Sequence, residues 1–418
     1  MTTLKQIIDP RIYRTQAGPD WPKFEDFIAG ATVSDSFIQR ELEQFVREQT
    51  ENYQAITLAG DTIALGNQQR QQQVFFNKQL IQPSPCRVPW NTLGINSNGQ
   101  VYICQSPSWI PKFVGNILQC TDIYDVLNST VAQQIRQEIL AGRYYYCNNR
   151  LCNFFGAIDS ESYTTQPVDQ DPLPFVPSPE LLVDQIPSEL VFDFDYTCNF
   201  KCPSCRTEVI NWNKDHVIRG INNGIVHQIK TLIIDHIDTQ PVNIRWCGGE
   251  PFISEVYMDL MNYIVGTGKT NIQSTIQTNG SYLKKHAAFM AGFLPHVTEL
   301  RISFDAGTAE TYSQLRANGD WEVLLDNVRF VKQLIDQQNF TTKLTADFVV
   351  QTDNYKEIPE FIKTCQDIGI TNINLQKMWN WGTTSQEEFD RNNIYNSAHP
   401  EYENLKQIFE SVRRKADF

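Results

Sequence analysis

The chain has 418 residues, with 35 basic and 48 acidic side chains and a formal net charge of −13. Hydrophobic residues make up 41% and charged residues 20%, a composition typical of globular and not of disordered proteins. The acidic balance argues against sequence-independent binding to nucleic acid or to anionic membranes, because both need clustered lysine and arginine. No apolar run approaches the roughly 20 residues of a membrane span, and the N-terminal sequence lacks the apolar stretch of a secretory signal. We therefore expect a cytoplasmic protein that, at roughly 150 residues per domain, has two or three domains.

The chain holds ten cysteines, and their spacing is its most informative feature. In a reducing compartment disulfides are rare, so clustered cysteines more often bind metal or take part in chemistry. Eight of the ten fall between Cys86 and Cys205, whereas Cys247 and Cys365 are isolated. Cys365 lies on the apolar stripe of a predicted helix and is expected to pack in the core. Cys247 is also expected to pack, with a role as a donor or radical site as the alternative.

Residues 1–82 are expected to form a helical N-terminal segment. The apolar pattern predicts helices over residues 21–30 and 35–50, and Asp35 or Ser36 is a suitable N-cap for the second of them. This segment carries no motif that indicates a function.

Residues 83–163 combine a hairpin with a helix. Alternating apolar and polar residues surround Asn98-Gly99, a dipeptide that favours a tight hairpin turn. The apolar periodicity over residues 125–142 predicts one helix, and Gly142 is suited to end it. The cysteines of this region flank the two elements: Cys86 and Cys104 lie at the ends of the hairpin, and Cys147 and Cys152 follow the helix. Four thiolates brought together in this way suit either zinc or an iron–sulfur cluster, and the chemistry alone leaves both open.

Residues 164–188 contain six prolines and are expected to be a domain linker. From residue 189 strand-like and helical runs alternate, which indicates an α/β fold with parallel strands and right-handed crossovers. The strand-like runs are residues 190–196, 242–247, 272–277, 297–304, 344–350 and 370–375, and the helical runs are 214–238, 254–267, 281–293, 320–337 and 355–368. Six strands are too few for a closed eight-stranded barrel, so a partial barrel and an open doubly wound sheet both fit. In either fold, ligands bind at the carboxyl ends of the strands.

The first of these strands leads directly into a loop with the spacing C-x3-C-x2-C, made by Cys198, Cys202 and Cys205. A thioredoxin-like redox pair would leave Cys198 unused, and a zinc site would lack a fourth ligand within the loop. A [4Fe–4S] cluster normally takes four thiolates. With three thiolates one iron keeps an open position, which usually means that a ligand or substrate binds there. We therefore interpret the loop as an iron–sulfur site.

The second strand ends in the sequence GGEP, residues 248–251. Gly248 and Gly249 allow the backbone to approach a ligand closely, since no Cβ stands in the way. Glu250 adds a carboxylate suited to an ammonium group. A Gly-Gly pair alone often only makes a turn, but at a strand end beside a three-cysteine loop it indicates a binding site.

The sequence resembles the radical S-adenosylmethionine (radical SAM) enzymes over about residues 189–380. Besides the three cysteines and GGEP, the matching motifs are QTNG at 277–280, SFDA at 303–306 and LR at 315–316. The resemblance implies a partial (β/α)6 barrel of TIM type. It also implies that the three thiolates hold a [4Fe–4S] cluster whose fourth iron binds the amino and carboxylate groups of SAM. Reductive cleavage of SAM in this family yields a 5′-deoxyadenosyl radical, which abstracts a substrate hydrogen.

The same resemblance assigns SAM-binding roles to individual residues. Gly248, Gly249 and Glu250 would meet the amino group of SAM. Ser303 and Arg316 would contact its carboxylate or the ribose region. A planar, permanently charged guanidinium suits a carboxylate; the alternative for Arg316 is an exposed charge on a helix surface.

The cysteines of residues 83–163 resemble those of the SPASM/twitch auxiliary-cluster domain of many radical SAM enzymes. The matching features are the C-x12-G-x4-C spacing, VGNI at 114–117 and the stretch 142–152. The resemblance implies one auxiliary [4Fe–4S] cluster held by Cys86, Cys104, Cys147 and Cys152. Cys120 is an alternative ligand, and a structural zinc ribbon is the alternative site. In most relatives this domain follows the barrel; here it precedes the barrel, so the linker must bring the auxiliary cluster to the barrel mouth.

The leading functional hypothesis is a radical SAM enzyme that modifies a peptide or protein, because SPASM/twitch enzymes mostly do so. The alternatives are a radical SAM dehydrogenase or mutase acting on a small molecule such as an amino-sugar alcohol, and a non-catalytic iron–sulfur electron carrier. An electron donor such as a flavodoxin or ferredoxin is expected, whereas neither nucleic acid nor a membrane is expected as a partner. The tail, residues 381–418, is expected to cap the barrel mouth, with Trp379 and Trp381 near a substrate or packed in the lid.

Overall fold

The computed structural model describes residues 79–80, 86–147, 152, 163–164, 172–206, 208–379 and 383–415. The helices predicted over residues 21–30 and 35–50, and Trp381, lie outside this described part. Contacts divide the chain into two units: the first is Met1–Phe194 with Lys214–Val242, and the second is Asp195–Asn213 with Asn243–Phe418. Each unit is considered by itself below.

The first unit contains the predicted hairpin. Strands β2 (Thr92–Asn96) and β3 (Gln100–Tyr102) pair antiparallel, with Ile95 opposite Val101. Between them Asn98 and Gly99 have φ of 62° and 76°, the left-handed region that the Asn-Gly dipeptide tolerates. The hairpin prediction is therefore confirmed. Two further strands extend the hairpin: β4 (Gly115–Asn116) pairs antiparallel with β3, and β6 (Glu189–Asp193) pairs parallel with β2. Two short helices also belong to this part of the unit, α5 (Val88–Asn91) and the 3-10 helix η3 (Ile117–Gln119).

The helical stretch after the hairpin is broken into two helices, α6 (Ile123–Leu127) and α7 (Thr130–Leu140). The prediction of one helix over residues 125–142 is wrong, because Ser129 starts a new helix by accepting a hydrogen bond from the backbone N–H of Ala132. The predicted end is confirmed: Gly142 has φ of 73° at the close of α7.

The second half of the proline-rich segment is fixed to the first unit. Val183 and the side chain of Asn128 exchange two hydrogen bonds of 2.8 Å, and Leu181 is 2% exposed within η5 (Pro179–Leu181). The same unit includes α9 (His216–Leu232) and η7 (Ile234–His236), and α9 packs on η2 (Ser97–Gly99) and η3. Two-residue strands β1 (Gln79–Leu80) and β5 (Tyr163–Thr164) pair antiparallel.

Arg136 is the polar centre of this unit. Its side chain is completely buried, and it donates to three backbone carbonyl oxygens, those of Pro89 (3.0 Å), Leu127 (2.8 Å) and Leu181 (2.8 Å). Burial lowers the pKa of Arg136 to about 10, so the guanidinium remains charged at neutral pH. One side chain thus joins α5, the α6–α7 turn and the proline-rich segment.

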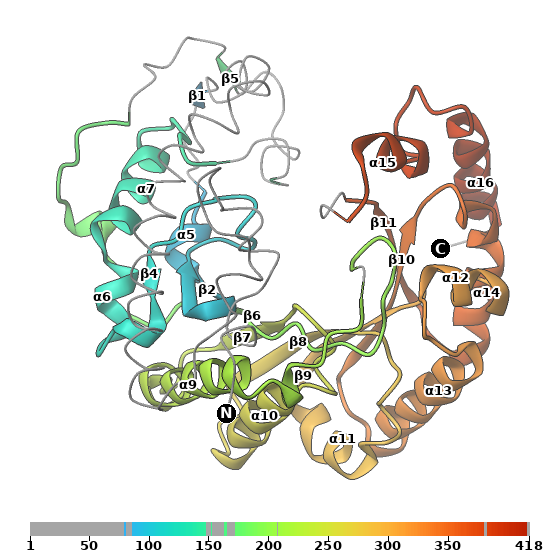
Figure 1. Cartoon of the computed structure of the whole chain (residues 1–418), viewed down its shortest axis with the longest axis horizontal. Helices are drawn as coiled ribbons and strands as arrows, with labels where there is room; N and C mark the ends of the chain where they lie inside the picture. Colours follow the sequence, from blue (N-terminus) through green and yellow to red (C-terminus); the bar gives the residue numbers. More distant parts are fainter. Residues whose placement is uncertain are drawn as a thin grey trace, which may run out of the picture. The chain divides into compact units, whose positions relative to one another are not determined.

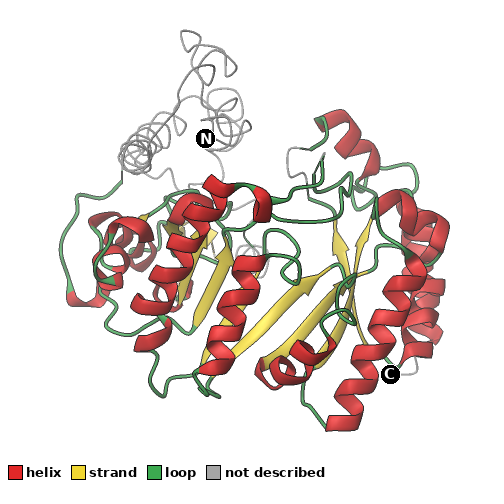
Figure 2. Ribbon diagram, turned by 60° about the horizontal axis from the view of Figure 1, so that its bottom comes forward, coloured by secondary structure: helices red, strands yellow, loops and turns green. Residues whose placement is uncertain are grey.

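The second unit is a parallel α/β sheet, as predicted. Its strands are β7 (Val242–Trp246), β8 (Ile272–Thr278), β9 (Val297–Ser303), β10 (Lys343–Val350) and β11 (Asn372–Lys377), in the spatial order β11-β10-β9-β8-β7. The pairs β8/β9, β9/β10 and β10/β11 are parallel. The helices that connect the strands lie along one face of the sheet (Figure 1, Figure 2): α10 is Glu255–Gly266, α11 is Ala287–Phe293, α13 is Trp321–Gln338 and α14 is Ile358–Ile368.

The core of this unit lies between sheet and helices. Ile244, Ile276 and Leu300 are fully buried and alternate along their strands with half-buried polar residues; Phe348 of β10 is also fully buried. Cys365 on α14 is also fully buried, and burial raises the pKa of its thiol to about 12. The prediction that Cys365 packs in the core is confirmed.

Some helices differ from the expected ones. The helix predicted over residues 281–293 begins only at Ala287, because Gly280 has φ of 75° and Ser281 donates a hydrogen bond to the side chain of Asn279, which together form a turn. In the described part of the second unit, three helices were not predicted: α12 (Ala309–Leu315), α15 (Gln386–Asn392) and α16 (Tyr402–Lys415).

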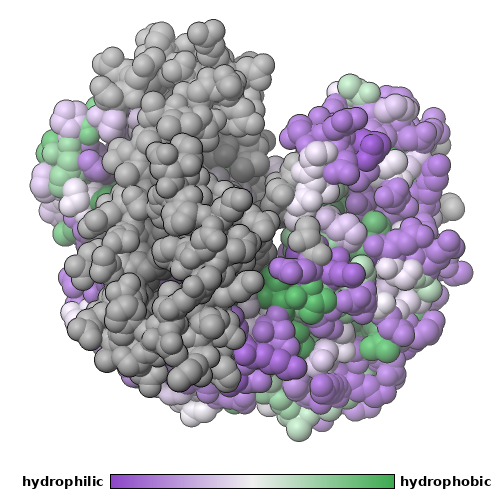
Figure 3. Space-filling view, viewed as in Figure 1, coloured by the Kyte–Doolittle hydropathy of each residue, from purple (hydrophilic) through white to green (hydrophobic). Residues whose placement is uncertain are grey.

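The tail packs on the segment that follows β10. The backbone N–H of Thr352 donates to the carbonyl of Asn392 at 3.2 Å, and α16 packs on α14. The face of this unit around α14, α15 and α16 is mostly hydrophilic (Figure 3). Within the described part of the chain, no helix is both long and apolar enough to cross a membrane.

Replacing Arg136 by methionine is expected to destabilise the first unit by about 2–4 kcal/mol, because three buried carbonyl oxygens lose their donor. The measurement is the midpoint of urea unfolding, compared between proteins whose unfolding free energy depends equally steeply on urea concentration. Arg87 is a matched control: both arginines lie over the Trp90 ring, Arg136 at 5.8 Å and the exposed Arg87 at 5.2 Å from its centroid. Arg87→Met should cost less than about 1 kcal/mol. Equal losses in the two variants would contradict the central role of Arg136.

Candidate functional site

The three cysteines of the second unit lie in one loop, residues 195–210, here named the cysteine loop. Cys198 and Ile210 form an isolated antiparallel bridge, with N–H···O distances of 2.8 and 3.2 Å. The backbone N–H groups of Cys205 and Arg206 both donate to the carbonyl of Cys202, at 2.9 and 3.0 Å. Cys198 and Cys202 are buried, and Cys205 is exposed. The loop therefore holds three thiols on a short segment with one of them toward solvent.

Two arginines act on these thiols. Burial raises the pKa of Cys198 to about 11, and the positive charge of Arg206 opposes that rise. Burial also raises the pKa of Cys202, and there the largest opposing effect comes from Arg316. Buried cations beside thiols favour the thiolate, the form that ligates metal.

The Gly-Gly-Glu segment binds the start of the cysteine loop through the backbone. Gly249 N–H donates to the carbonyl of Asp195 at 2.9 Å, and Glu250 N–H donates to that of Thr197 at 2.7 Å. A Cβ on Gly249 would stand 2.0 Å from the Thr197 carbonyl oxygen, and Gly248 has φ of 97°. The close approach that requires Gly249 is therefore an approach to the protein's own backbone.

The Glu250 carboxylate is buried and accepts three hydrogen bonds from the protein. One oxygen accepts from the Thr278 hydroxyl at 2.7 Å and from Phe252 N–H at 3.2 Å, and the other accepts from Asn279 N–H at 2.6 Å. Burial raises the pKa of Glu250, and these hydrogen bonds oppose the rise. Glu250 thus joins the end of β7 to the end of β8, where the QTNG motif lies.

The QTNG motif also reaches the cysteine loop. The side-chain amide of Asn279 donates to the side-chain oxygen of Asn199 at 2.9 Å, and Asn199 donates to the Ser281 hydroxyl at 3.0 Å. The family resemblance includes this motif but assigns it no role. Its residues brace the loop between Cys198 and Cys202.

A buried polar network beneath the loop was not predicted. Asp195 accepts from Thr197 N–H at 2.7 Å and from the Ser254 hydroxyl at 2.8 Å. The Tyr257 hydroxyl accepts from Asp195 N–H at 3.0 Å and donates to the carbonyl of Cys247 at 3.1 Å. The signal that could have found it is the Asp-x-Thr spacing, which favours an Asx-type turn.

Arg316 lies at the end of α12, inside the protein. Its side chain is 14% exposed, one terminal nitrogen is 3.3 Å from a carboxylate oxygen of Asp305, and the guanidinium lies 5.8 Å from the centre of the Phe200 ring. Its Nε is buried and has no hydrogen-bond partner among the residues that the structure describes. The alternative of an exposed helix-surface charge is wrong. Ser303, at the end of β9, accepts from the Gln277 side chain at 2.9 Å.

Arg206 was not singled out from the sequence, because an arginine after the third cysteine has the pattern of any loop charge. It is 7% exposed and makes three contacts. Nη1 donates to the carbonyl of Tyr196 at 3.0 Å, and Nη2 donates to the carbonyl of Gly248 at 3.0 Å and to Cys205 Sγ at 3.5 Å. Arg206 thus connects the cysteine loop to the Gly-Gly-Glu segment.

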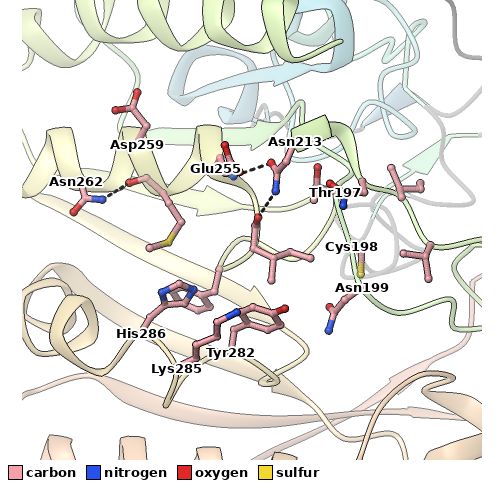
Figure 4. A pocket seen from close by; sticks show the side chains of 16 residues that line it. Thr197, Cys198, Asn199, Asn213, Glu255, Asp259, Asn262, Tyr282, Lys285 and His286 are labelled. Carbon is pink, nitrogen blue, oxygen red and sulfur yellow. Dashed lines mark hydrogen bonds between the residues drawn. The ribbon is translucent and has the colours of Figure 1, made fainter. Parts of the chain in front are cut away.

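A pocket of about 580 Å³ adjoins the cysteine loop, and of the predicted site residues it includes only Cys198. Figure 4 shows Tyr282, Lys285 and His286 on one side of it. On the other side Asn213 donates to the carbonyl of Ile253 at 2.7 Å and accepts from a backbone N–H at 3.0 Å. The lining is mixed, because Phe252, Ile253 and Met258 lie beside the polar side chains, and it includes neither Glu250 nor Arg316.

The four cysteines predicted for the auxiliary site come together in the first unit. Each of Cys86, Cys104 and Cys147 has its thiol pKa raised, first by burial and then by others of the four, to about 12 for Cys104. Cys152 is among the groups that raise the pKa of all three. Cys120 has different neighbours: its pKa is raised to about 11 by burial and by Asp125 and Asp122, and its thiol donates to the carbonyl of Ile117 at 3.3 Å.

The donor chemistry of both sets fits iron–sulfur clusters. In the described ranges no group of three or more His, Cys, Asp or Glu side chains is placed to hold a single metal ion. A [4Fe–4S] cluster takes one thiolate at each protein-bound iron. Three thiols beside two buried guanidiniums, and four thiols that perturb one another, supply the soft anionic donors that such clusters need.

Comparison with known proteins identifies both domains. Residues 194–374 match the radical SAM superfamily, and residues 86–153 match SPASM, an iron–sulfur cluster-binding domain. The chain therefore carries a radical SAM domain with a SPASM domain N-terminal to it, and the α/β partial-barrel fold class and both resemblances are confirmed. These domains imply SAM and [4Fe–4S] clusters as cofactors.

Individual relatives are distant. A probable GTP 3′,8-cyclase from Methanocaldococcus jannaschii is 26% identical over 174 residues, 41% of this chain and 53% of that protein. A probable GTP 3′,8-cyclase from Saccharolobus islandicus is 22% identical over 226 residues, 54% of this chain and 65% of that protein. The chain thus spans about half to two thirds of the length of these curated relatives. Among solved structures, Streptococcus suis SuiB bound to S-adenosylmethionine has a TM-score of 0.36 at 15% identity, covering 56% of this chain and 49% of that one.

Gly249→Ala is expected to cost about 1–3 kcal/mol of stability, because the new Cβ forces the Gly-Gly-Glu segment away from Thr197. The iron content of the reconstituted Gly249→Ala protein should also fall. Gly266→Ala is the matched control, since a Cβ there meets no atom within 4 Å, and it should be neutral or stabilising by up to about 1 kcal/mol. Urea unfolding and iron analysis check both. A Gly249→Ala protein as stable as Gly266→Ala would refute the backbone constraint.

Proposed function

We propose that this chain is a radical SAM enzyme that reductively cleaves S-adenosylmethionine and uses the 5′-deoxyadenosyl radical to abstract a hydrogen from a peptide or protein substrate. The observation that carries the proposal is the cysteine loop, in which three thiols meet buried guanidinium groups and the backbone of a Gly-Gly-Glu segment. A non-catalytic electron carrier would need neither that segment nor a three-thiol loop.

Each predicted residue has a proposed role. Cys198, Cys202 and Cys205 hold a [4Fe–4S] cluster that keeps one iron open for SAM. The segment from Gly248 to Glu250 meets the amino group of SAM; two backbone hydrogen bonds to the cysteine loop support this, since they keep the segment beside the cluster ligands. The Glu250 carboxylate accepts three hydrogen bonds from the protein. Since a carboxylate has about four acceptor positions, one is left for the ammonium group of SAM.

Arg316 and Ser303 are proposed to contact the carboxylate or ribose region of SAM. The buried Nε of Arg316, without a partner in the described part of the chain, supports an anionic ligand, because a buried donor left unsatisfied costs about 1–3 kcal/mol. Arg316 also influences Cys202 electrostatically, which is consistent with a ligand bound next to the cluster.

In the SPASM domain, Cys86, Cys104, Cys147 and Cys152 are proposed to hold an auxiliary [4Fe–4S] cluster. The mutual electrostatic effect of the four thiols supports this set, and the acidic neighbours of Cys120 argue against its use as a ligand. The auxiliary cluster would accept or relay the electron left on a product radical, or bind substrate. A flavodoxin or ferredoxin is proposed as the electron donor.

The substrate is proposed to be polar. The face of the sheet away from the helices carries Gln277, Arg301, Asp347 and Asn374, where a closed barrel normally has branched apolar residues. Arg301 and Asp347 form a two-bond ion pair of 2.6 and 3.0 Å, and Asn374 donates to Asp347 at 2.7 Å. A peptide and an amino-sugar alcohol both match such a surface. The peptide is preferred because SPASM relatives mostly act on peptides; the nucleotide cyclases among the relatives favour the small-molecule alternative.

The first test uses anaerobically reconstituted protein with SAM and dithionite, and quantifies 5′-deoxyadenosine by mass spectrometry. Alanine at Cys198, Cys202 or Cys205 should abolish the product. Cys147→Ala is the control: it should lose auxiliary iron but keep the change that SAM causes in the electron paramagnetic resonance spectrum. Product formed at the wild-type rate by the Cys198→Ala protein would eliminate the proposed cluster site.

The substrate class is tested with deuterium-labelled candidates, one set of peptides and one set of amino-sugar alcohols. Because the proposed step moves a hydrogen atom from substrate to the deoxyadenosyl radical, deuterium should appear in 5′-deoxyadenosine only with the true class. Transfer from a peptide supports peptide modification. Transfer from an alcohol alone would replace it by small-molecule chemistry.

A further inference from the structure

Arg206 is an arginine buried between two segments of the proposed site. Only 7% of it is exposed, although its neighbours in the loop, Lys201 and Cys205, are exposed. Its guanidinium has three acceptors within hydrogen-bond distance: two backbone carbonyl oxygens at 3.0 Å and Cys205 Sγ at 3.5 Å. A buried cation carries a desolvation cost unless anionic or polar partners surround it.

Arg206 brings a permanent positive charge to the loop, because an arginine side chain stays protonated in proteins. Its Nη2 lies 3.5 Å from Cys205 Sγ and 3.0 Å from the carbonyl oxygen of Gly248. The charge is therefore fixed beside one of the three sulfur atoms of the loop.

A purely structural brace explains only part of this arrangement. The carbonyls of Tyr196 and Gly248 account for a link between the cysteine loop and the Gly-Gly-Glu segment. A brace does not require that the same nitrogen that meets Gly248 also meet Cys205 Sγ. This second contact places the charge next to a sulfur that is proposed to ligate iron.

We propose that Arg206 is a positioning residue that raises the reduction potential of the [4Fe–4S] cluster held by Cys198, Cys202 and Cys205. The inference rests on the proposed function, because it takes these three cysteines as the ligands. Reduction adds one electron, supplied by a flavodoxin or ferredoxin, and makes the cluster with its thiolates one unit more negative. A fixed positive charge and a hydrogen bond to a ligating sulfur stabilise the reduced state more than the oxidised one.

The test is a redox titration of reconstituted holoprotein followed by electron paramagnetic resonance. Arg206→Gln removes the charge but keeps a side chain that can donate to one carbonyl. The ratio of reduced to oxidised cluster at a fixed potential should fall about tenfold, equivalent to a shift of about 59 mV to more negative potential for one electron. Arg206→Lys keeps a charge without the fork that reaches three acceptors, and should shift the potential in the same direction by less.

Two controls accompany these variants. Lys201→Gln removes a positive charge from the same loop at an exposed position, where water screens it, and should leave the potential unchanged. The auxiliary cluster in the same sample is an internal reference, and its potential should not move.

The outcomes separate this inference from the proposed function. A fully loaded Arg206→Gln protein with the wild-type potential overturns the inference, whatever the enzyme does with SAM. If Arg206→Gln does not retain iron, Arg206→Lys decides alone, and an unshifted potential there overturns it equally. Absence of SAM cleavage by the wild type would instead contradict the proposed function and leave the measured potentials as they are.

Discussion

The site depends on a backbone-to-backbone contact between the Gly-Gly-Glu segment and the start of the cysteine loop. Two hydrogen bonds, from Gly249 to Asp195 and from Glu250 to Thr197, fix the distance, and that distance leaves no room for a Cβ at Gly249. Since backbone groups make the contact, its geometry does not depend on side-chain rotamers. Two further connections follow from this one: Glu250 accepts a hydrogen bond from Asn279 at the end of β8, and Asn279 in turn donates to Asn199 of the loop. The loop therefore receives its shape from the carboxyl ends of two strands that follow it in the chain.

Buried charge is the second constraint. Two guanidiniums and the carboxylates of Glu250 and Asp305 lie in a region where burial shifts pKa values strongly. The ion pair of Arg316 with Asp305 and the contact of Arg206 with Cys205 satisfy part of this charge inside the protein. Because isolated buried charges are costly, such a group of residues persists only as a set. Removing one member affects the ionisation of the others as well as its own contacts.

A feature could be predicted from the sequence when the residues that determine it lie close together in the chain. The Asn98-Gly99 turn, the parallel strands and the two cysteine sets depend on short spacings that are visible in one segment. The break between α6 and α7 was missed because the apolar periodicity continues across Ser129, whose cap competes with a continuous helix. The roles of Glu250 and Arg206 were missed or incomplete for a different reason. Apart from Cys205 next to Arg206, their partners lie 28 or more residues away or are backbone atoms, which carry no residue-type signal.

The two arginines near the thiols differ in which of their hydrogen-bond donors have partners within the protein. This difference indicates different roles for the two side chains. Arg206 directs its terminal nitrogens at two carbonyls and a sulfur of its own chain, so its charge is committed to the loop. Arg316 makes one 3.3 Å ion pair and keeps a buried Nε with no partner among the described residues. An unused buried donor suits an anionic group that binds and dissociates, whereas a guanidinium bonded to its own chain suits a permanent neighbour. On this reasoning we propose that Arg206 acts on the cluster through its ligands, and that Arg316 contacts the SAM molecule bound at the open iron.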